Sequence, residues 1–260
     1  MNQKKDLKTI LIKHFDDSYD DNLFSYGSKT IELPLRSSYI ELEDFWKSKS
    51  LGEKEILDYC CGSGLHSIFP AKLGAKVTGI DFSKNSIRKA KIRALNCEVE
   101  NNCKFFSGDL EDQHINSISD QYDFILVIDS LLYLNMEQTF LILSKLLKPE
   151  GEIIIIEGMG SNIFFNLNRK KNTNSYAPGF EQELSKKTIK EISESFSNLF
   201  YIKKEAYFGL FSSAAYILKN KFNIKLNIKF FLYIDELIKK IPFMRKYFFR
   251  CFLNLKKINI

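Results

Sequence analysis

One stretch decides how the rest of the chain is interpreted: Glu55-Ile-Leu-Asp-Tyr-Cys-Cys-Gly-Ser-Gly-Leu-His-Ser67. Its apolar first residues predict a buried strand, Gly62 and Gly64 predict a tight turn, and a helical pattern begins directly afterwards. In a parallel sheet, such a junction presents backbone N–H groups and a helix N-terminus to a ligand. The stretch therefore predicts a ligand site where the first strand ends.

Strand and helix patterns alternate from this stretch onward. Strands are predicted over residues 55–60, 76–80, 103–106, 122–128, 152–157, 200–208 and 247–255. Helices are predicted over residues 64–74, 84–95, 136–147 and 186–197, with Ser185 as the expected N-cap of the last one. Strands separated by helices imply right-handed crossovers and a parallel sheet covered on both faces. The predicted fold class is therefore α/β.

Four segments are expected along the chain. Residues 1–54 predict a helical N-terminal lead-in, and residues 55–208 form the core. Residues 209–246 form a basic, amphipathic insertion, and residues 247–260 supply the last strand and a tail. Within the core, residues 161–179 are rich in Asn, Lys and Ser, which predicts a loop or lid.

The insertion admits two interpretations of its local structure. Residues 221–230 alternate with period two, as a strand would, yet Phe222, Phe230 and Leu237 also fit one helix face. We favour one continuous helix, because the helical pattern extends to Pro242, which would end it.

Cysteine usage and hydropathy bound the class of protein. The five cysteines are odd in number and include no Cys-x-x-Cys pair, so neither a disulfide framework nor a metal site is predicted. No apolar run approaches the roughly 20 residues that span a bilayer. We therefore expect a cytoplasmic protein.

Basic charge is concentrated near the C-terminal end. The net charge is +6, and residues 219–260 carry 11 Lys and Arg side chains against only Asp235 and Glu236. The preceding residues carry 27 basic and 30 acidic side chains. This asymmetry suggests contact with a membrane, a nucleic acid or an acidic substrate. A solvated surface with a compositional bias is the alternative.

Two classes of cofactor use a glycine turn after the first strand. A dinucleotide-binding turn has the pattern Gly-x-Gly-x-x-Gly. Here Ser67 replaces the third glycine, and the carboxylate of Asp58 would lie close to a pyrophosphate. An acid at this place suits a cationic ligand better, so an NAD-dependent oxidoreductase is the less favoured alternative.

Further motifs follow the turn in a fixed order. They are Val77-Thr-Gly-Ile-Asp81-Phe-Ser, Phe105-Phe-Ser-Gly-Asp109-Leu, Tyr122-Asp-Phe-Ile-Leu-Val-Ile-Asp129-Ser-Leu-Leu-Tyr133 and Leu146-Leu-Lys-Pro-Glu-Gly-Glu152. With the turn, this series resembles the class I S-adenosylmethionine-dependent methyltransferases from Glu55 to Phe208. The resemblance implies a Rossmann-like, seven-stranded, mostly parallel sheet with a final antiparallel strand. It also implies S-adenosylmethionine as the cofactor.

The resemblance assigns residues to the methionine end of this cofactor. Gly62 and Gly64 would let the backbone approach the amino acid part, and Asp58 would face its ammonium group. Cys60 stands where the family has the first glycine of the turn. Asp129 and Ser130 would supply backbone contacts.

The resemblance also assigns residues to the nucleoside end. Asp81, 19 residues beyond Gly62, would accept hydrogen bonds from both ribose hydroxyls. Phe82 would offer its ring to the adenine, and Asp109, followed by Leu110, would accept a hydrogen bond from the adenine amino group.

The acceptor of the methyl group is less well defined. A base is needed only when the acceptor is a hydroxyl or a protonated amine. The candidates are His14, Tyr19, Asp129, Tyr133 and Glu157. Nucleic acid is disfavoured, because no Asn-Pro-Pro-Tyr motif follows the fourth strand and no Cys pair is placed for RNA methylation. The predicted function is methyl transfer to a small-molecule, sugar or lipid-like acceptor, with a non-catalytic S-adenosylmethionine-binding protein as the alternative.

The family topology also gives the insertion a predicted position. It would emerge on the cofactor side of the sheet, where it would roof the acceptor site or rest on an anionic membrane through residues 219–250. An ordinary cap over the sheet edge or a contact between subunits is the alternative.

Overall fold

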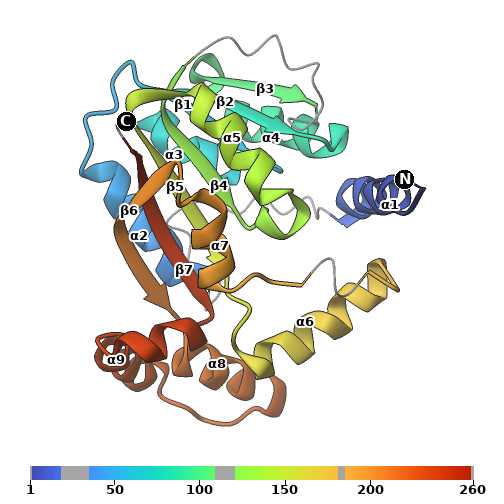
Figure 1. The fold of residues 1–260 in the computed structure, drawn as a ribbon, viewed down its shortest axis with the longest axis vertical. Coiled ribbons are helices and arrows are strands. Elements are labelled where there is room, and N and C mark those ends of the chain that lie inside the picture. The colour runs from blue at the N-terminus through green and yellow to red at the C-terminus, as the bar shows by residue number, and fades with distance from the viewer. Residues whose placement is uncertain (1, 19–34, 109–120, 181–184, 259–260) are drawn as a thin grey trace.

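The computed structural model of the chain describes residues 2–18, 35–108, 121–180 and 185–258 (Figure 1). Its centre is a 7-stranded sheet with the strand order β3-β2-β1-β4-β5-β7-β6. The strands are β1 (Glu55–Tyr59), β2 (Lys76–Asp81), β3 (Cys103–Ser107), β4 (Tyr122–Ile128), β5 (Leu147–Gly158), β6 (Phe200–Phe208) and β7 (Arg250–Lys257). Each predicted strand is present.

Strand directions confirm the predicted fold class. The first five strands pair in parallel, whereas β7 runs antiparallel to both β5 and β6. The chain order reverses between β1 and β4, and ligands bind at such switch points beyond the carboxyl ends of the strands.

Helices cover both faces of the sheet. One face packs against α2 (Leu35–Lys47), α3 (Leu65–Lys72) and α4 (Lys84–Asn96). The other face packs against α5 (Met136–Leu146) and α7 (Ile189–Phe196). Neighbouring residues of the strands alternate between the two cores, as the two-residue period of a strand requires. None of the described helices is long and apolar enough to cross a bilayer.

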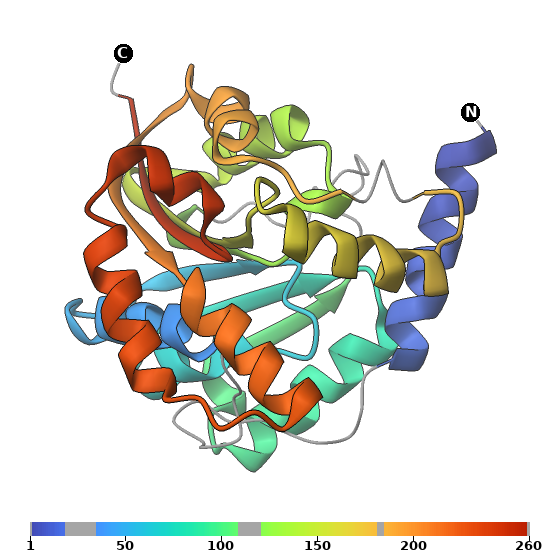
Figure 2. The same ribbon diagram turned by 90° about the horizontal axis from the view of Figure 1, so that it is seen from below.

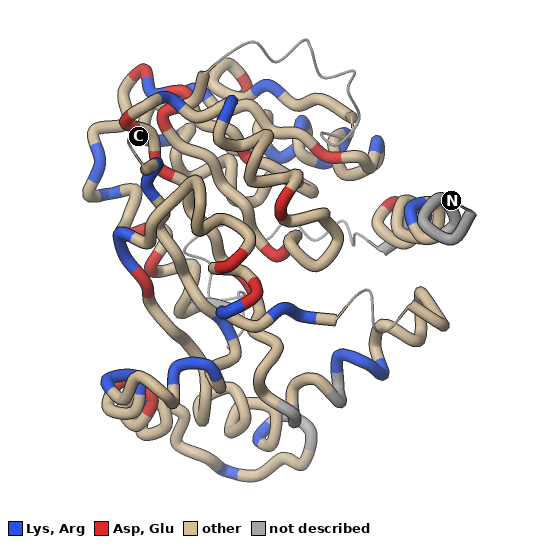
Figure 3. Tube along the Cα trace, in the orientation of Figure 1, with Lys and Arg blue, Asp and Glu red and all other residues tan. Residues whose placement is uncertain are grey.

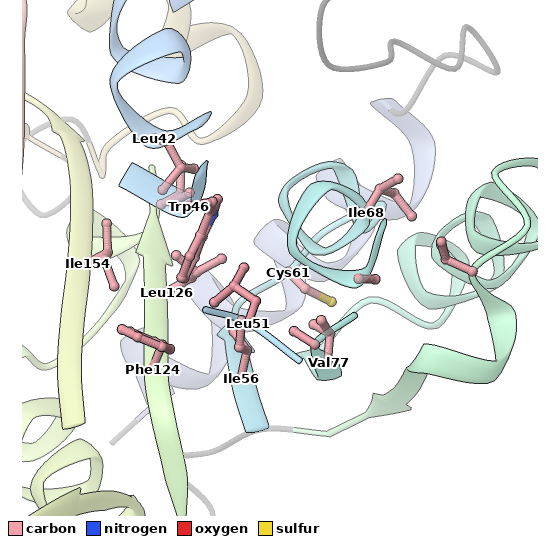
Figure 4. Close-up of a cluster of buried hydrophobic side chains, with 14 of the residues drawn as sticks. Leu42, Trp46, Leu51, Ile56, Cys61, Ile68, Val77, Phe124, Leu126 and Ile154 are labelled. Carbon is pink, nitrogen blue, oxygen red and sulfur yellow. The ribbon is translucent and has the colours of Figure 1, made fainter. Parts of the chain in front are cut away.

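The α2 helix anchors the N-terminal segment to the sheet (Figure 4). Leu42 and Trp46 are fully buried, and the Trp46 ring packs edge-on against Phe124 of β4 with 5.3 Å between ring centres. This packing places α2 next to the core that supports the glycine turn.

The loop predicted at residues 161–179 is wrong, because most of the segment is the helix α6 (Ile163–Tyr176). Its use as a lid stays a prediction. Asn162 starts this helix, where its side-chain oxygen accepts a hydrogen bond from the N–H of Phe165 at 3.4 Å. The Phe165 ring is buried 4.7 Å from that of Phe249. Tertiary packing thus overrides the weak helix propensity of the Asn-rich sequence.

Ser185 is not the cap of the following helix. The helix α7 begins at Ile189, and Thr188 caps it through a reciprocal capping box with Glu191. The Thr-x-x-Glu spacing is the better start signal, because both side chains satisfy backbone N–H groups.

The single helix predicted within the insertion is also wrong. Two helices, α8 (Phe211–Phe222) and α9 (Ile228–Ile238), are followed by a 3-10 turn, η3 (Pro242–Tyr247). Asn223 ends α8 in a left-handed conformation with φ of 53°, and the side chain of Asn227 caps α9. Asparagine adopts both roles readily, which divides the apolar periodicity into two pieces. The last strand begins at Arg250 rather than Tyr247.

Candidate active site

The glycine turn lies between β1 and α3 and is tightly folded. Cys60, Gly62 and Gly64 have φ angles of 60°, 51° and 72°. A Cβ atom on Gly64 would lie 2.9 Å from the Cβ atom of Ala90 on α4, so a larger residue would collide there. The turn therefore brings bare backbone to the carboxyl end of the sheet.

The carboxylate of Asp81 lies against this turn. Its Oδ2 accepts a hydrogen bond from the N–H of Gly62 at 2.9 Å, and its Oδ1 accepts one from the N–H of Ser83 at 2.9 Å. Burial raises the pKa of Asp81, while both N–H donors oppose that rise. Each carboxylate oxygen accepts about two hydrogen bonds, so each retains room for a further donor.

Asp58 is buried beneath the turn. Its Oδ2 accepts a hydrogen bond from the hydroxyl of Ser67 on α3 at 2.6 Å. Burial raises the pKa of Asp58 to about 7, and the negative charge of Asp81 adds to the rise. A cation close to Asp58 would favour its ionised form, because opposite charges stabilise one another.

An ion pair between a buried guanidinium and a partly exposed carboxylate joins the ends of β4 and β7. Asp129 follows β4, and its Oδ2 lies 2.6 Å from Nη2 of Arg250, whose side chain is 1% exposed. Burial would raise the pKa of Asp129, but Arg250 and Lys186 outweigh burial and hold this pKa below its usual range. Asp129 is therefore a paired anion at neutral pH.

Glu157, at the end of β5, holds the loop that follows β4. Its carboxylate accepts hydrogen bonds from the N–H groups of Leu131 at 3.0 Å and Gly158 at 2.9 Å, and it pairs with Lys186. The side chain is fully enclosed by these donors and by the sheet. Glu157 is therefore an anchor for this loop rather than an open proton acceptor.

An aromatic cluster connects α1 (Asn2–Ser18) with the strand ends. Figure 2 shows α1 next to α6. Phe15 packs edge-on against Phe82 and Tyr133, with 5.8 and 5.3 Å between ring centres. His14 stacks on Tyr176 of α6 at 4.0 Å. Burial and the neighbouring Tyr176 raise the pKa of Tyr133. Three predicted site residues, from separate parts of the sequence, thus meet in one cluster.

The remaining predicted residues are placed as follows. Ser130 is buried, and its hydroxyl has no hydrogen-bond partner among the described residues. Tyr19, Asp109 and Leu110 lie outside the described residues. Within the described part of the chain, no group of three or more His, Cys, Asp or Glu side chains is arranged to hold a metal ion.

These features fit S-adenosylmethionine. The glycine turn lies against Asp81, which retains acceptor positions, and the hydroxyl of Ser130 is buried without a described partner. Asp58 supplies a carboxyl group next to the turn. This donor and acceptor set suits a ligand with hydroxyl groups and positive charge.

Sequence reasoning did not include Arg250 or Tyr39 in this region. The Arg250 guanidinium lies 5.2 Å from the ring centre of Tyr39, and that ring packs 4.8 Å from His66. Burial lowers the pKa of His66 to about 3, so its imidazole is neutral. The sequence does contain a signal for Arg250, which is the only charged residue in the apolar run Phe248-Phe-Arg-Cys-Phe252. An arginine in such a run is expected to be buried, and a buried cation requires an anion as its partner. Tyr39 carried no such signal.

A family model described as a methyltransferase domain matches residues 51–210. The chain belongs to this methyltransferase family. The matched range covers the glycine turn, Asp81, Asp129 and Glu157. The expected resemblance to class I S-adenosylmethionine-dependent methyltransferases is thereby confirmed.

Curated relatives of this methyltransferase include two ubiquinone biosynthesis O-methyltransferases. That of Salmonella paratyphi A is 31% identical over 121 residues, which cover 46% of this chain and 47% of the relative. That of Aeromonas salmonicida is 33% identical over 110 residues, which cover 42% of this chain and 45% of the relative. The chain thus spans about half the length of the curated relatives it matches.

Solved structures share the fold of this methyltransferase. Geranyl diphosphate C-methyltransferase from Streptomyces coelicolor A3(2) gives a TM-score of 0.65 at 12% identity, over 96% of this chain and 98% of the other. The MccD protein gives a TM-score of 0.58 at 16% identity, over 85% and 98%. At these identities the likeness shows the fold alone.

Proposed function

We propose that this protein transfers a methyl group from S-adenosylmethionine to a small, lipid-like acceptor. The observation that carries the proposal is the carboxylate of Asp81, held against the glycine turn by the N–H of Gly62 with acceptor positions to spare. Membership of the methyltransferase family supports the same reaction.

The proposed cofactor residues divide by their chemistry. Gly62 and Gly64 receive the amino acid part, and Asp58 balances its ammonium charge, with Cys60 beside them. Asp129 and Ser130 complete this end. Asp81 accepts hydrogen bonds from the ribose hydroxyls and Phe82 flanks the adenine, and we assign Asp109 and Leu110 to the adenine as well. When bound, S-adenosylmethionine supplies an electrophilic methyl group.

The protein's own contribution is orientation and exclusion of water. Correct alignment of two reactants can be worth about 7–11 kcal/mol of the barrier. The aromatic cluster around Phe15 and Tyr133 shields the strand ends from solvent. If the acceptor is a hydroxyl, His14 is the base we propose, because its imidazole lies in the cluster over the strand ends, stacked on Tyr176. Asp129 and Glu157 are already paired with cations.

Two observations favour a lipid-like acceptor over a sugar. The covering cluster is apolar, with Leu11, Leu132 and Ala177 buried in it. The matched relatives are named for ubiquinone biosynthesis, although the chain covers only about half of each. If this acceptor is dissolved in a membrane, the basic segment at residues 219–250 would bring the protein to it.

Isothermal titration with S-adenosylhomocysteine tests the cofactor site. We expect binding by the wild type and a loss of about 1–3 kcal/mol of binding free energy in Asp81→Ala, because ribose hydroxyls would lose their acceptor. Asp44→Ala, which removes an exposed carboxylate on α2, is the matched control and should bind normally. Equal affinity in Asp81→Ala would remove Asp81 from the site, and binding of NAD in preference would contradict the proposal.

Transfer of labelled methyl groups to a cell extract tests the acceptor class. We expect label in the fraction soluble in organic solvent. Label in the water-soluble fraction would contradict a lipid-like acceptor while upholding methyl transfer. Normal cofactor binding without any transfer would favour a non-catalytic S-adenosylmethionine-binding protein.

A further inference from the structure

The α8 helix has its apolar face turned outward. Its described buried side chains are small or polar, namely Ser212, Ser213 and Ala215. Phe211, Ile217, Leu218 and Phe222 are all exposed. This is the reverse of a helix that covers a soluble core, in which the large apolar residues face inward.

The α9 helix shows the same inversion. Asp235 is its only described residue that is buried. Phe230, Tyr233 and Leu237 are 56%, 62% and 46% exposed, and their spacing places them along one side of the helix. Phe243 in the following η3 turn is 69% exposed and adds another aromatic ring.

Hydrogen bonds that the carboxylate of Asp235 accepts hold this arrangement together. Its carboxylate accepts from the N–H of Phe211 at 2.7 Å, the N–H of Ser212 at 3.2 Å and the Ser212 hydroxyl at 2.6 Å. An anion is favourable at the N-terminus of a helix. The acid of α9 therefore holds the start of α8 from inside, and the apolar side chains of both helices remain outside.

The charges around this apolar surface are almost all positive (Figure 3). We define the α8–α9 surface as the exposed apolar residues Phe211, Ile217, Leu218, Phe222, Ile224, Phe230, Tyr233, Leu237, Ile241 and Phe243. Lysines within and beside it are Lys219, Lys225, Lys229, Lys239, Lys240 and Lys246. The exposed acid Glu236 is paired with Lys239. The rim therefore complements an anionic partner.

We propose that the α8–α9 surface docks on an anionic lipid bilayer. Aromatic and aliphatic side chains would enter the boundary between headgroups and acyl chains, and the lysines would contact lipid phosphates. A second copy of the chain fits less well, because it would bring two positive rims together. The purpose of docking rests on the proposed function, because a lipid-like acceptor would be taken up from the bilayer. Docking itself requires no methyl transfer.

Co-sedimentation with vesicles tests this docking. The full chain should bind vesicles of phosphatidylglycerol and phosphatidylcholine at low salt, with weaker binding as salt rises and little binding to phosphatidylcholine alone. The triple variant Phe230→Ser, Tyr233→Ser, Leu237→Ser should lose at least tenfold in vesicle affinity. Absence of binding by the wild type, or full binding by this variant, would overturn the proposal.

A matched control removes the same number of exposed apolar side chains elsewhere. Ile92→Ser and Leu95→Ser on α4, with Leu141→Ser on α5, should leave vesicle binding unchanged. If both triple variants lost the same amount of vesicle affinity, the proposal that the α8–α9 surface is the docking site would be overturned. Both variants should bind S-adenosylhomocysteine as the wild type does, so failure of docking is distinguished from failure of the cofactor site.

Fluorescence locates the contact. Trp46 is the only tryptophan of the chain and is fully buried, so a tryptophan introduced by Tyr233→Trp reports on its own surroundings. Brominated lipids should quench it when vesicles are added, whereas a tryptophan introduced by Leu141→Trp should be unaffected. Equal quenching at both positions would overturn the assignment. A dimer in vesicle-free solution that the Phe230, Tyr233 and Leu237 substitutions abolish would identify a second copy as the partner instead.

Discussion

At the scale of single residues, Cys60 shows how the turn tolerates a departure from the glycine pattern. Its φ of 60° lies in the left-handed region, which disfavours any side chain. We expect Cys60→Gly to be more stable than Cys60→Ala by about 1 kcal/mol, because both lose the thiol and only glycine relieves the backbone. Urea denaturation measures this difference. Equal stabilities of the two variants would show that the turn relaxes around Cys60.

Asp58 predicts a pH dependence of stability. Its native pKa of about 7 exceeds the ordinary value of 3.8, so between these values the native state holds a proton that the unfolded state has lost. The contribution of Asp58 to stability is thus fully present below the ordinary pKa and falls as pH rises through the native pKa. Asp58→Asn should remove this loss, which is about 1.4 kcal/mol per pH unit over the window.

The comparison for Asp58 must be made between variants. Burial lowers the pKa of His66 to about 3, so at mildly acidic pH His66 is protonated in the unfolded protein and neutral in the native one. The contribution of His66 to stability therefore rises with pH, whereas that of Asp58 falls. Urea titrations of the wild type and Asp58→Asn at several pH values isolate the Asp58 part. Parallel stability curves for the two proteins would place the native pKa of Asp58 near its ordinary value.

At the scale of elements, hydrogen bonds join the end of α1 to the start of α4. The carboxylate of Asp16 accepts from the Ser83 hydroxyl at 2.5 Å, and its carbonyl accepts from the side chain of Asn85 at 2.6 Å. Asp16→Ala should loosen α1, so that proteolysis within α1 speeds up and S-adenosylhomocysteine binds about tenfold more weakly, the effect of losing about 1.4 kcal/mol. Asp44→Ala on α2 is the control. Unchanged affinity with faster proteolysis would show that α1 does not cover the cofactor.

The elements also show which local signals are reliable. The start of α7 follows from the Thr188 and Glu191 spacing, because a capping box is a local interaction. The α6 helix cannot be predicted from a local pattern, because it depends on the packing of Phe165 against Phe249, which is distant in the sequence. Asn223 likewise ends α8 within a continuous apolar pattern.

At the scale of the whole molecule, the pair of Asp129 and Arg250 ties the end of β4 to the start of β7 across 121 residues of sequence. Asp129→Asn should cost about 1–3 kcal/mol of unfolding free energy, because the buried guanidinium loses its partner charge while water reaches the exposed side of Asp129. Arg250→Met in the same chain should restore part of that loss. A double-mutant cycle by urea denaturation measures the coupling, and additive losses would contradict it.

The sequence by itself determined the α/β class of the core, the glycine turn and the acid at the end of the second strand. These features depend on residues close together in the chain and on spacing that the fold makes regular. Only the tertiary structure decided that Arg250 meets Asp129 and that α8 and α9 turn their apolar sides outward. Both features depend on a buried charged side chain, Arg250 or Asp235, that is paired with groups on another element. A local sequence pattern does not contain the information for such a long-range pairing.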